Sequence, residues 1–332
     1  MGSRGTVLAP PGGGGHVPGD ASHPYRTLRI LAVTATALTF VLIAIGALVR
    51  ASGSGDACPD WPRCLGRWVP RFQVHVLIEY SHRFTATLDI IAVAALAIYA
   101  WRRYRDRRRV VVPSVAALGL IVVQAALGGI VVLSKLEALN VTLHLGTAMV
   151  LAATLVLATV NAFSVDAVVV RPASSLTVLA GLTAGWAFGL ILVGGWVRGA
   201  GAGLAFGDWP LMGGRAIPDL SVGSQALQFA HRILALGLGV LLASLLVRAW
   251  RWPGAARAVP VLATVASVCY LGQVLVGAAL VWTRLEVAPE VAHVALAGAI
   301  WGTLVAVFAA SRLRAAEPVP AGAPAAARER PA

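Results

Sequence analysis

The sequence predicts an all-α integral membrane protein, with eight transmembrane helices arranged as two tandem four-helix bundles that are related by pseudo-two-fold symmetry along the membrane normal. Three observations predict this fold class. The 332-residue chain is 58% hydrophobic and only 12% charged, which leaves more apolar surface than a soluble globule can bury. Its apolar residues gather in runs of membrane-spanning length, and its two halves resemble each other.

The apolar runs define the helices in chain order. A helix of about 20 residues crosses the hydrocarbon core of a bilayer. The runs cover residues 29–50, 76–100, 110–133, 139–161, 175–197, 225–247, 258–282 and 290–311. Residues 1–27 and 313–332 are rich in Gly, Ala and Pro, which predicts disordered tails. Between the tails we expect an N-terminal half, 28–165, and a C-terminal half, 172–312.

Arginine placement predicts the orientation of the chain. A net charge of +13 is compatible with nucleic-acid binding, but the arginines cluster beside the ends of the predicted helices, as in WRRYRDRRR at 101–109. By the positive-inside rule these loops and both termini are cytoplasmic, and the protein is a multi-pass protein of the cell membrane. No nucleic-acid partner is expected. The loop that holds Cys58 and Cys64 then faces the outside, where disulfides persist.

An internal repeat relates the two halves. Three pairs of segments match: 46–70 with 194–218, 79–83 with 228–232, and 124–144 with 273–293. In the first pair, 12 of 25 positions are identical without a gap. Because each half has an even number of helices, both halves enter the membrane in the same orientation, which places the symmetry axis along the membrane normal.

The repeat sorts the intramembrane histidines into a symmetric set. His82 pairs with His231, and His144 pairs with His293, all near the outer helix ends. A single histidine on an apolar helix is more often a hydrogen-bonded core residue, but four in duplicated register predict one bis-histidine site in each half. Such pairs suit axial ligation of haem iron. Zinc fits less well, because no carboxylate or thiol completes a tetrahedral set in both halves.

Glu79 is the main difference between the halves. It lies three residues before His82, on the same helix face, and its counterpart is Gln228, which cannot exchange a proton. His75 lies one turn earlier, so His75, Glu79 and His82 form a candidate row for proton handling, with Glu79 as the candidate acid or base. The second half is expected to have no acid beside its histidines. A buried carboxylate bonded to a neighbour is the alternative for Glu79, and a wetted position at the helix start is the alternative for His75.

Other polar and small residues have two interpretations each. Arg83 and Arg232 follow the first histidine of each half, where they either pair with haem propionates or extend outward to water. Glycines on the third helix of each half either make room for a macrocycle or only allow close helix packing; they are Gly128, Gly129 and Gly277.

The cysteine pair also occurs in one half only. Phe206 and Met212 stand where the first half has Cys58 and Cys64, although both loops keep an Asp-Trp-Pro segment. The loop shape therefore does not depend on the thiols, which argues against a shared metal site. A staple and a redox role both stay open for the pair.

These motifs together resemble the haem A synthase family, over about residues 28–312. The resemblance rests on CPDWPRC in the first outer loop, EYSHR and QFAHR on the second and sixth helices, and the histidines of the fourth and eighth. It implies a membrane oxidoreductase that oxidises a ring methyl of haem O to a formyl group by successive hydroxylations, giving haem A for terminal oxidases. It further implies a haem b in the C-terminal half, with His231 and His293 as the axial ligands of its iron.

The resemblance also implies roles in the N-terminal half. His82 and His144 bind the iron of the substrate haem O, Glu79 is needed for activity, and Cys58 and Cys64 form a disulfide. We expect that disulfide in a loop that caps the substrate site, with a role in loading or redox delivery beyond stapling.

Two other classes of function stay open on the sequence alone. One is a diheme b-type cytochrome that exchanges electrons with quinone, although four ligands near the same outer face do not stack cofactors across the bilayer. The other is a transporter with parallel repeats, in which the histidines relay protons. For the enzyme, the expected partners are haem O, membrane lipid, an electron-transfer partner of unknown identity and the haem O-producing farnesyltransferase.

Overall fold

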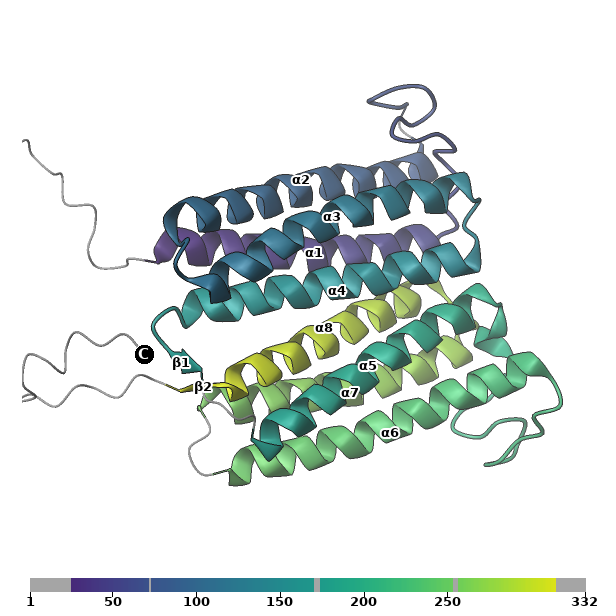
Figure 1. Ribbon diagram of the computed structural model, residues 1–332. Helices are drawn as coiled ribbons and strands as arrows, with labels where there is room; N and C mark the ends of the chain where they lie inside the picture. Colours follow the sequence, from purple (N-terminus) through teal and green to yellow (C-terminus); the bar gives the residue numbers. More distant parts are fainter. Residues whose placement is uncertain (1–24, 72, 170–173, 253–255, 315–332) are drawn as a thin grey trace, which may run out of the picture.

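Eight long helices make up the computed structural model, which describes residues 25–71, 73–169, 174–252 and 256–314 (Figure 1). They are α1 (Arg26–Ala51), α2 (Val74–Arg103), α3 (Arg108–Leu133), α4 (Ala138–Phe163), α5 (Ser175–Gly199), α6 (Gly223–Arg251), α7 (Ala258–Trp282) and α8 (Val287–Ser311). All eight are long and apolar enough to cross a membrane, and each contains its predicted span. The predicted eight-helix membrane fold is therefore confirmed. Residues 1–24 and 315–332 of the predicted tails lie outside the described residues.

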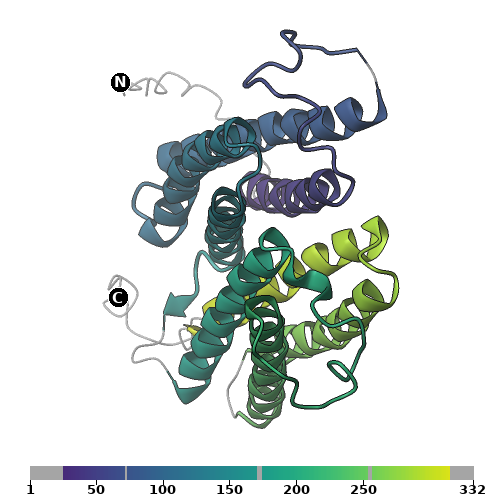
Figure 2. The same cartoon turned by 90° about the vertical axis from the view of Figure 1, so that its right-hand side faces the viewer.

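The helices pack in two groups of four. Within α1–α4 and within α5–α8, each helix contacts the next, and the first contacts the fourth. The two groups meet along a seam formed by α1 and α4 on one side and α5 and α8 on the other, and Figure 2 shows the groups one above the other. The long loops that follow α1 and α5 lie at the same end of the bundle (Figure 1). We refer to α1–α4 as the N-terminal half and to α5–α8 as the C-terminal half.

The seam is part of the apolar core. The largest buried cluster combines Met149 and Ala152 of α4 with residues of α5, α6, α7 and α8. Trp301 of α8 donates its indole N–H to the Met149 carbonyl oxygen at 2.8 Å. Phe40 of α1 packs against Gly302 of α8, where an added Cβ would lie only 2.5 Å from its ring. Close packing of this kind is what holds membrane helices together, because lipid offers no hydrophobic drive for association.

Three short elements were not predicted from the sequence. They are the 3-10 helix η1 (Ala202–Leu204) and the antiparallel strands β1 (Val168–Val169) and β2 (Leu313–Arg314). The strand pair ties the link between the halves to the end of α8, so the predicted C-terminal tail begins inside an ordered contact. A two-residue strand has no periodicity to detect, and its partner lies far away in the chain.

Candidate functional site

In the N-terminal half, each candidate histidine packs against a glycine of the preceding helix. His82 on α2 faces Gly46 on α1, where an added Cβ would lie 3.0 Å from the imidazole Cε1 atom. His144 on α4 faces Gly128 on α3 in the same way, at 3.2 Å. A side chain at either glycine would push the ring aside. The glycines of α1 and α3 therefore provide the space in which the imidazole rings of α2 and α4 lie.

The C-terminal half has the same arrangement. His231 on α6 faces Gly194 on α5, and His293 on α8 faces Gly277 on α7, with added-Cβ distances of 3.1 and 3.4 Å. The sequence-based interpretation named Gly128 and Gly277 but missed Gly46 and Gly194. The sequence contains an indication of these two glycines, because they are the first identical positions of the aligned segments 46–70 and 194–218.

The four imidazoles have the chemistry of axial ligands. The Nδ1 atom of each ring is buried and has no hydrogen-bond partner among the described residues, although buried polar atoms normally find one. The charge of His144 would act on His82, and the charge of His231 would act on His293, so the two rings of each half interact electrostatically. Among the described residues, no group of three or more His, Cys, Asp and Glu side chains could hold a metal ion. Each half thus offers a pair of imidazoles, which fits haem iron.

Glu79 fastens the loop between α1 and α2 to α2. Its side chain is buried, and both of its carboxylate oxygens are engaged. Oε2 accepts the backbone N–H of Cys58 at 2.7 Å, and Oε1 pairs with the guanidinium of Arg83 at 2.5 Å. The alternative of a buried carboxylate bonded to its neighbours therefore describes Glu79 in this structure.

Gln228 does the same work in the C-terminal half. Its Oε1 atom accepts the backbone N–H of Phe206 at 2.7 Å, and its Nε2 atom donates to the Gly203 carbonyl oxygen at 2.5 Å. Both loops are thus anchored by a side chain one turn before the first histidine. Both halves therefore have a side chain that anchors the loop at this position. They differ in its charge, because Glu79 is a carboxylate that pairs with Arg83, whereas Gln228 is a neutral amide.

The predicted row His75, Glu79 and His82 is not a hydrogen-bonded chain in the described structure. His75 is exposed, and its Nδ1 atom lies 2.9 Å from the Ser54 hydroxyl oxygen, which agrees with a wetted position at the start of α2. The two hydrogen bonds of Glu79 go to Cys58 and Arg83.

The expectation of no acid beside the histidines of the second half is wrong. Glu290 lies three residues before His293 in the first turn of α8, the spacing that Glu79 has to His82. It is buried, and its Oε1 atom pairs with Arg198 of α5 at 2.5 Å. Alignment of the first histidines, His82 and His231, does not reveal it, because Glu290 belongs to the second histidine of its half.

Arg83 and Arg232 take a role that neither interpretation described. Arg83 donates to the carbonyl oxygens of Asp60, Arg63 and Cys58, at 2.8, 2.5 and 2.7 Å. Arg232 donates to the corresponding loop through Leu211 and Asp208, at 3.0 and 3.1 Å. Both guanidinium groups therefore hold loop backbone to the helix.

An aspartate organises the tip of each loop. Asp60 accepts the N–H groups of Leu65 and Gly66, at 2.6 and 2.8 Å, and Asp208 accepts those of Gly213 and Gly214. These bonds stabilise the ionised carboxylate, so the Gly66 bond above all lowers the pKa of Asp60 below its usual value. The pKa of Asp208 is lowered in the same way, first by Gly214.

The predicted disulfide is present. Cys58 and Cys64 are bonded, with Cα atoms 4.7 Å apart, and both are buried against Val76. Phe206 and Met212, which replace them in the second loop, are buried as well. The disulfide thus occupies the interior of a loop that the other half fills with a ring and a thioether.

Asp89 is a polar intramembrane residue that the sequence-based interpretation missed. It lies seven residues inward from His82 on α2, is fully buried, and accepts the Thr39 hydroxyl of α1 at Oδ2 at 2.8 Å. Its Oδ1 atom has no partner among the described residues. The corresponding pair in the other half is Leu238 and Ala187, both buried and apolar. The comparison that singled out Glu79 would also have found Asp89, had it been continued along the helix.

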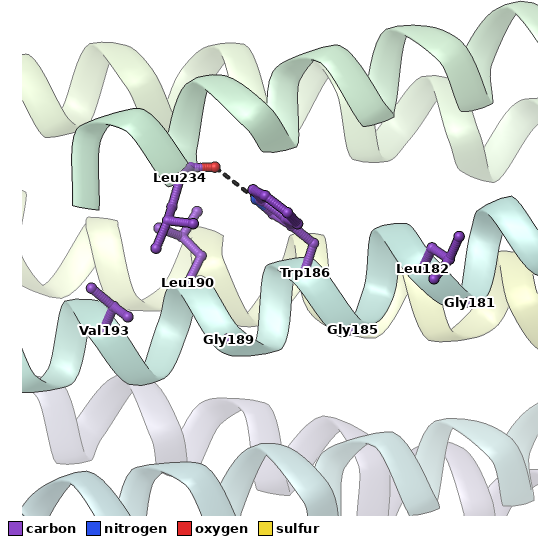
Figure 3. A pocket seen from close by; sticks show the side chains of 8 residues that line it. All are labelled: Gly181, Leu182, Gly185, Trp186, Gly189, Leu190, Val193 and Leu234. Atoms are coloured by element: carbon purple, nitrogen blue, oxygen red, sulfur yellow. Dashed lines mark hydrogen bonds between the residues drawn. The ribbon is translucent and has the colours of Figure 1, made fainter. Parts of the chain in front are cut away.

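A groove lies apart from these residues, between α5 and α6 (Figure 3). Its volume is about 490 Å³, and the indole N–H of Trp186 closes one side by donating to the Leu234 carbonyl oxygen at 2.8 Å. The residues that line it are Gly181, Leu182, Gly185, Trp186, Gly189, Leu190, Val193 and Leu234. None of the candidate site residues is among them.

Comparison with known proteins gives a consistent result. Residues 29–305 match the family model COX15-CtaA, described as cytochrome oxidase assembly protein. A protein of Halalkalibacterium halodurans named Heme A synthase is 35% identical over 237 residues, which are 69% of this chain and 76% of the relative. A Staphylococcus aureus protein of the same name is 31% identical over 225 residues, which are 63% of this chain and 71% of the relative.

Proposed function

The chain belongs to the COX15-CtaA family of cytochrome oxidase assembly proteins, and we propose that it is a haem A synthase. In this function it oxidises a ring methyl group of haem O to a formyl group by successive hydroxylations. The family resemblance that the sequence motifs predicted is confirmed. The rival classes, a diheme cytochrome and a transporter, have no support from the relatives.

One observation supports the two haem sites most directly. Four buried imidazoles lie in matched positions, each against a glycine, and each has a ring nitrogen without a partner among the described residues. We infer that the halves are copies of one repeated unit. His231 and His293 would then hold the iron of a resident haem b, and His82 and His144 would hold the iron of the substrate haem.

The polar groups around the two sites support this division of roles. The N-terminal half has the Glu79 carboxylate on the loop anchor and Asp89 in the helix interior, where the C-terminal half has Gln228 and Leu238. Oxidation of a methyl group needs a site for a proton, and Glu79 offers one beside the first histidine of its half. The acid of the C-terminal half, Glu290, lies beside the second histidine and is paired with Arg198. When bound, haem b would supply one-electron transfer.

The residues of this chain then divide the work on the substrate. His82 and His144 fix the macrocycle, and the loop anchored by Glu79 and Arg83 closes the site and excludes water. Glu79 lies one turn from His82 and is the acid–base group of the reaction. Because Arg83 pairs with Oε1 of Glu79 and also holds a loop carbonyl oxygen, we propose that movement of the loop and proton transfer at Glu79 are coupled.

The orientation and partners follow from the same proposal. Both termini are cytoplasmic, and the loops over the haem sites face outward in the cell membrane. The disulfide then lies on the oxidising side, in the loop over the substrate site, where we propose that it acts in loading or redox delivery. Haem O is too apolar to diffuse freely in water, so the farnesyltransferase that makes it is the proposed docking partner, beside an electron-transfer partner.

The test is the pigment of the purified protein. Haems extracted and separated by chromatography should include haem B together with haem O or haem A, and cells that make haem O should form haem A only when they express this chain. Haem B alone in both sites would support the cytochrome instead, and a colourless protein would support the transporter.

A further inference from the structure

Arg50 lies beside the site of the N-terminal half without a partner of its own. It is in the last turn of α1, four residues after Gly46, the glycine that faces His82. Residues four apart share a helix face, so Arg50 is one turn outward from the cradle of that imidazole. Its Nε atom is buried, and no hydrogen bond or ion pair joins it to a described residue.

The corresponding arginine of the C-terminal half is already paired. Arg198 lies four residues after Gly194, the glycine that faces His231, and its Nε atom contacts Glu290 Oε1 at 2.5 Å. The residue that corresponds to Glu290 in the N-terminal half is Val141 on α4. One half thus supplies a carboxylate for its arginine, and the other half supplies a valine.

Nearby acidic residues do not make up for the missing carboxylate. The charges of Glu290 and Asp56 act on Arg50, but neither residue forms an ion pair with it, and Arg198 adds a like charge close by. A half-buried guanidinium without a partner is costly, and its planar donors match a carboxylate in bidentate geometry. The structure therefore has a place for one more carboxylate at the outer end of the seam.

We propose that Arg50 binds a propionate carboxylate of the substrate macrocycle in the N-terminal half. The inference rests on the proposed function, because that function brings a molecule with two carboxylates to His82 and His144. This role explains why the N-terminal half has Val141 where the C-terminal half has Glu290. Glu290 pairs permanently with Arg198, whereas Arg50 stays available for the carboxylate of a substrate that binds and leaves. It also orients the macrocycle, with its propionate edge toward the outer loops.

The experiment is a titration of the purified full-length protein with haem B, haem O and the dimethyl ester of each, followed by Soret absorption. The esters lack the carboxylates but keep the iron and the ring. A His82→Ala variant should abolish the titration, which locates it in the N-terminal half. The native protein should bind the acids about ten- to a hundredfold more tightly than the esters, the range expected for a hydrogen bond between charged groups.

Three variants separate this role from a structural one. Arg50→Gln should lose most of the preference for the acids and bind the esters as the native protein does. Val141→Glu should have the same effect with Arg50 in place, because it supplies the carboxylate that Glu290 supplies to Arg198. Arg50→Lys should keep part of the preference. The exposed Arg67→Gln is the matched control for the loss of one outer charge and should change nothing.

Other outcomes overturn the inference. Equal binding of acid and ester by the native protein contradicts it, and so does an equal loss of both in Arg50→Gln, which would indicate a structural role. Haem B has the same propionates as haem O, so the comparison of acid with ester tests the role of Arg50 with either haem. The test therefore remains valid if the protein binds haem B and haem O equally well. That last result would count against the proposed function alone.

Discussion

The loop after α1 and the loop after α5 have the same scaffold and different chemistry. In each, an aspartate accepts two backbone N–H groups at the tip, an arginine of the next helix holds loop carbonyls, and a buried side chain of that helix accepts a loop N–H. The first loop adds a disulfide and a carboxylate, where the second has Phe206, Met212 and Gln228. The shared aspartate, arginine and anchoring side chain therefore determine the shape of the loop, whereas the disulfide and the carboxylate of Glu79 are particular to the N-terminal half.

The interiors of the halves differ in the same direction. The C-terminal half pairs Arg198 with Glu290 and packs Leu238 against apolar neighbours, whereas the N-terminal half leaves Arg50 and one oxygen of Asp89 without partners among the described residues. Polar groups that a half does not satisfy internally are groups that a ligand can satisfy. At these two positions the N-terminal half is the less satisfied of the two, which supports the proposal that the substrate occupies the first half and the resident haem the second.

The largest effect should come from the histidines, which test the assignment of the halves. His82→Ala should remove haem O and haem A from the purified protein and leave haem B, whereas His231→Ala should remove haem B. Each change deletes one of the two proposed axial ligands of its site. Chromatography of the extracted haems measures both. If the two variants lost the same haem, the halves would not have separate roles.

The next largest effect should come from Glu79→Gln, which places at position 79 the residue that anchors the loop of the C-terminal half, Gln228. The amide can still accept the Cys58 N–H, as Gln228 accepts that of Phe206, so the loop should stay closed. Formation of haem A should fall by about a hundredfold or more, as expected on removal of an acid–base group. Haem occupancy, measured by absorption, is the control. Undiminished haem A formation at normal occupancy would leave Glu79 with the loop anchor as its only role.

Replacing Cys58 by Phe and Cys64 by Met installs the residues of the second loop and tests the disulfide. Phe206 and Met212 are buried in the same places, so the variant loop should keep its packing. The yield of haem A should drop several-fold, at unchanged haem B content, if the disulfide serves loading or redox delivery. A full yield in cells would return the pair to a staple.

Thr39→Ala should have the smallest effect, on stability rather than on the reaction. It removes the donor to Asp89 and leaves both oxygens of a buried acid unpaired, which should cost about 1–3 kcal/mol of unfolding free energy. The double variant Thr39→Ala, Asp89→Leu has the apolar pair of the other half and should regain that loss. Thermal unfolding in detergent measures both. A double variant less stable than Thr39→Ala would show that the site needs the carboxylate.

Hydrophobic runs and the matching segments of the two halves predict most of the architecture from the sequence alone. All eight spans were predictable, because a bilayer requires each crossing segment to be a continuous apolar helix. Comparison of aligned positions also selected the four histidines, Glu79 and the cysteine pair. The same comparison, made at every buried position, would have added Gly46, Asp89 and the Val141–Glu290 difference.

Only the tertiary structure decided how these residues meet. Packing of α1 against α2 determines that the imidazole of His82 lies against Gly46. Packing of α5 against α8 determines that Arg198 pairs with Glu290, a partner that Arg50 lacks among the described residues. The bonds from Glu79 and Arg83 to the loop likewise depend on how a flexible-looking segment folds back on α2. Helix periodicity reports which face a residue lies on, but the partner on that face is set by the rotation and register of another helix, which no local pattern contains.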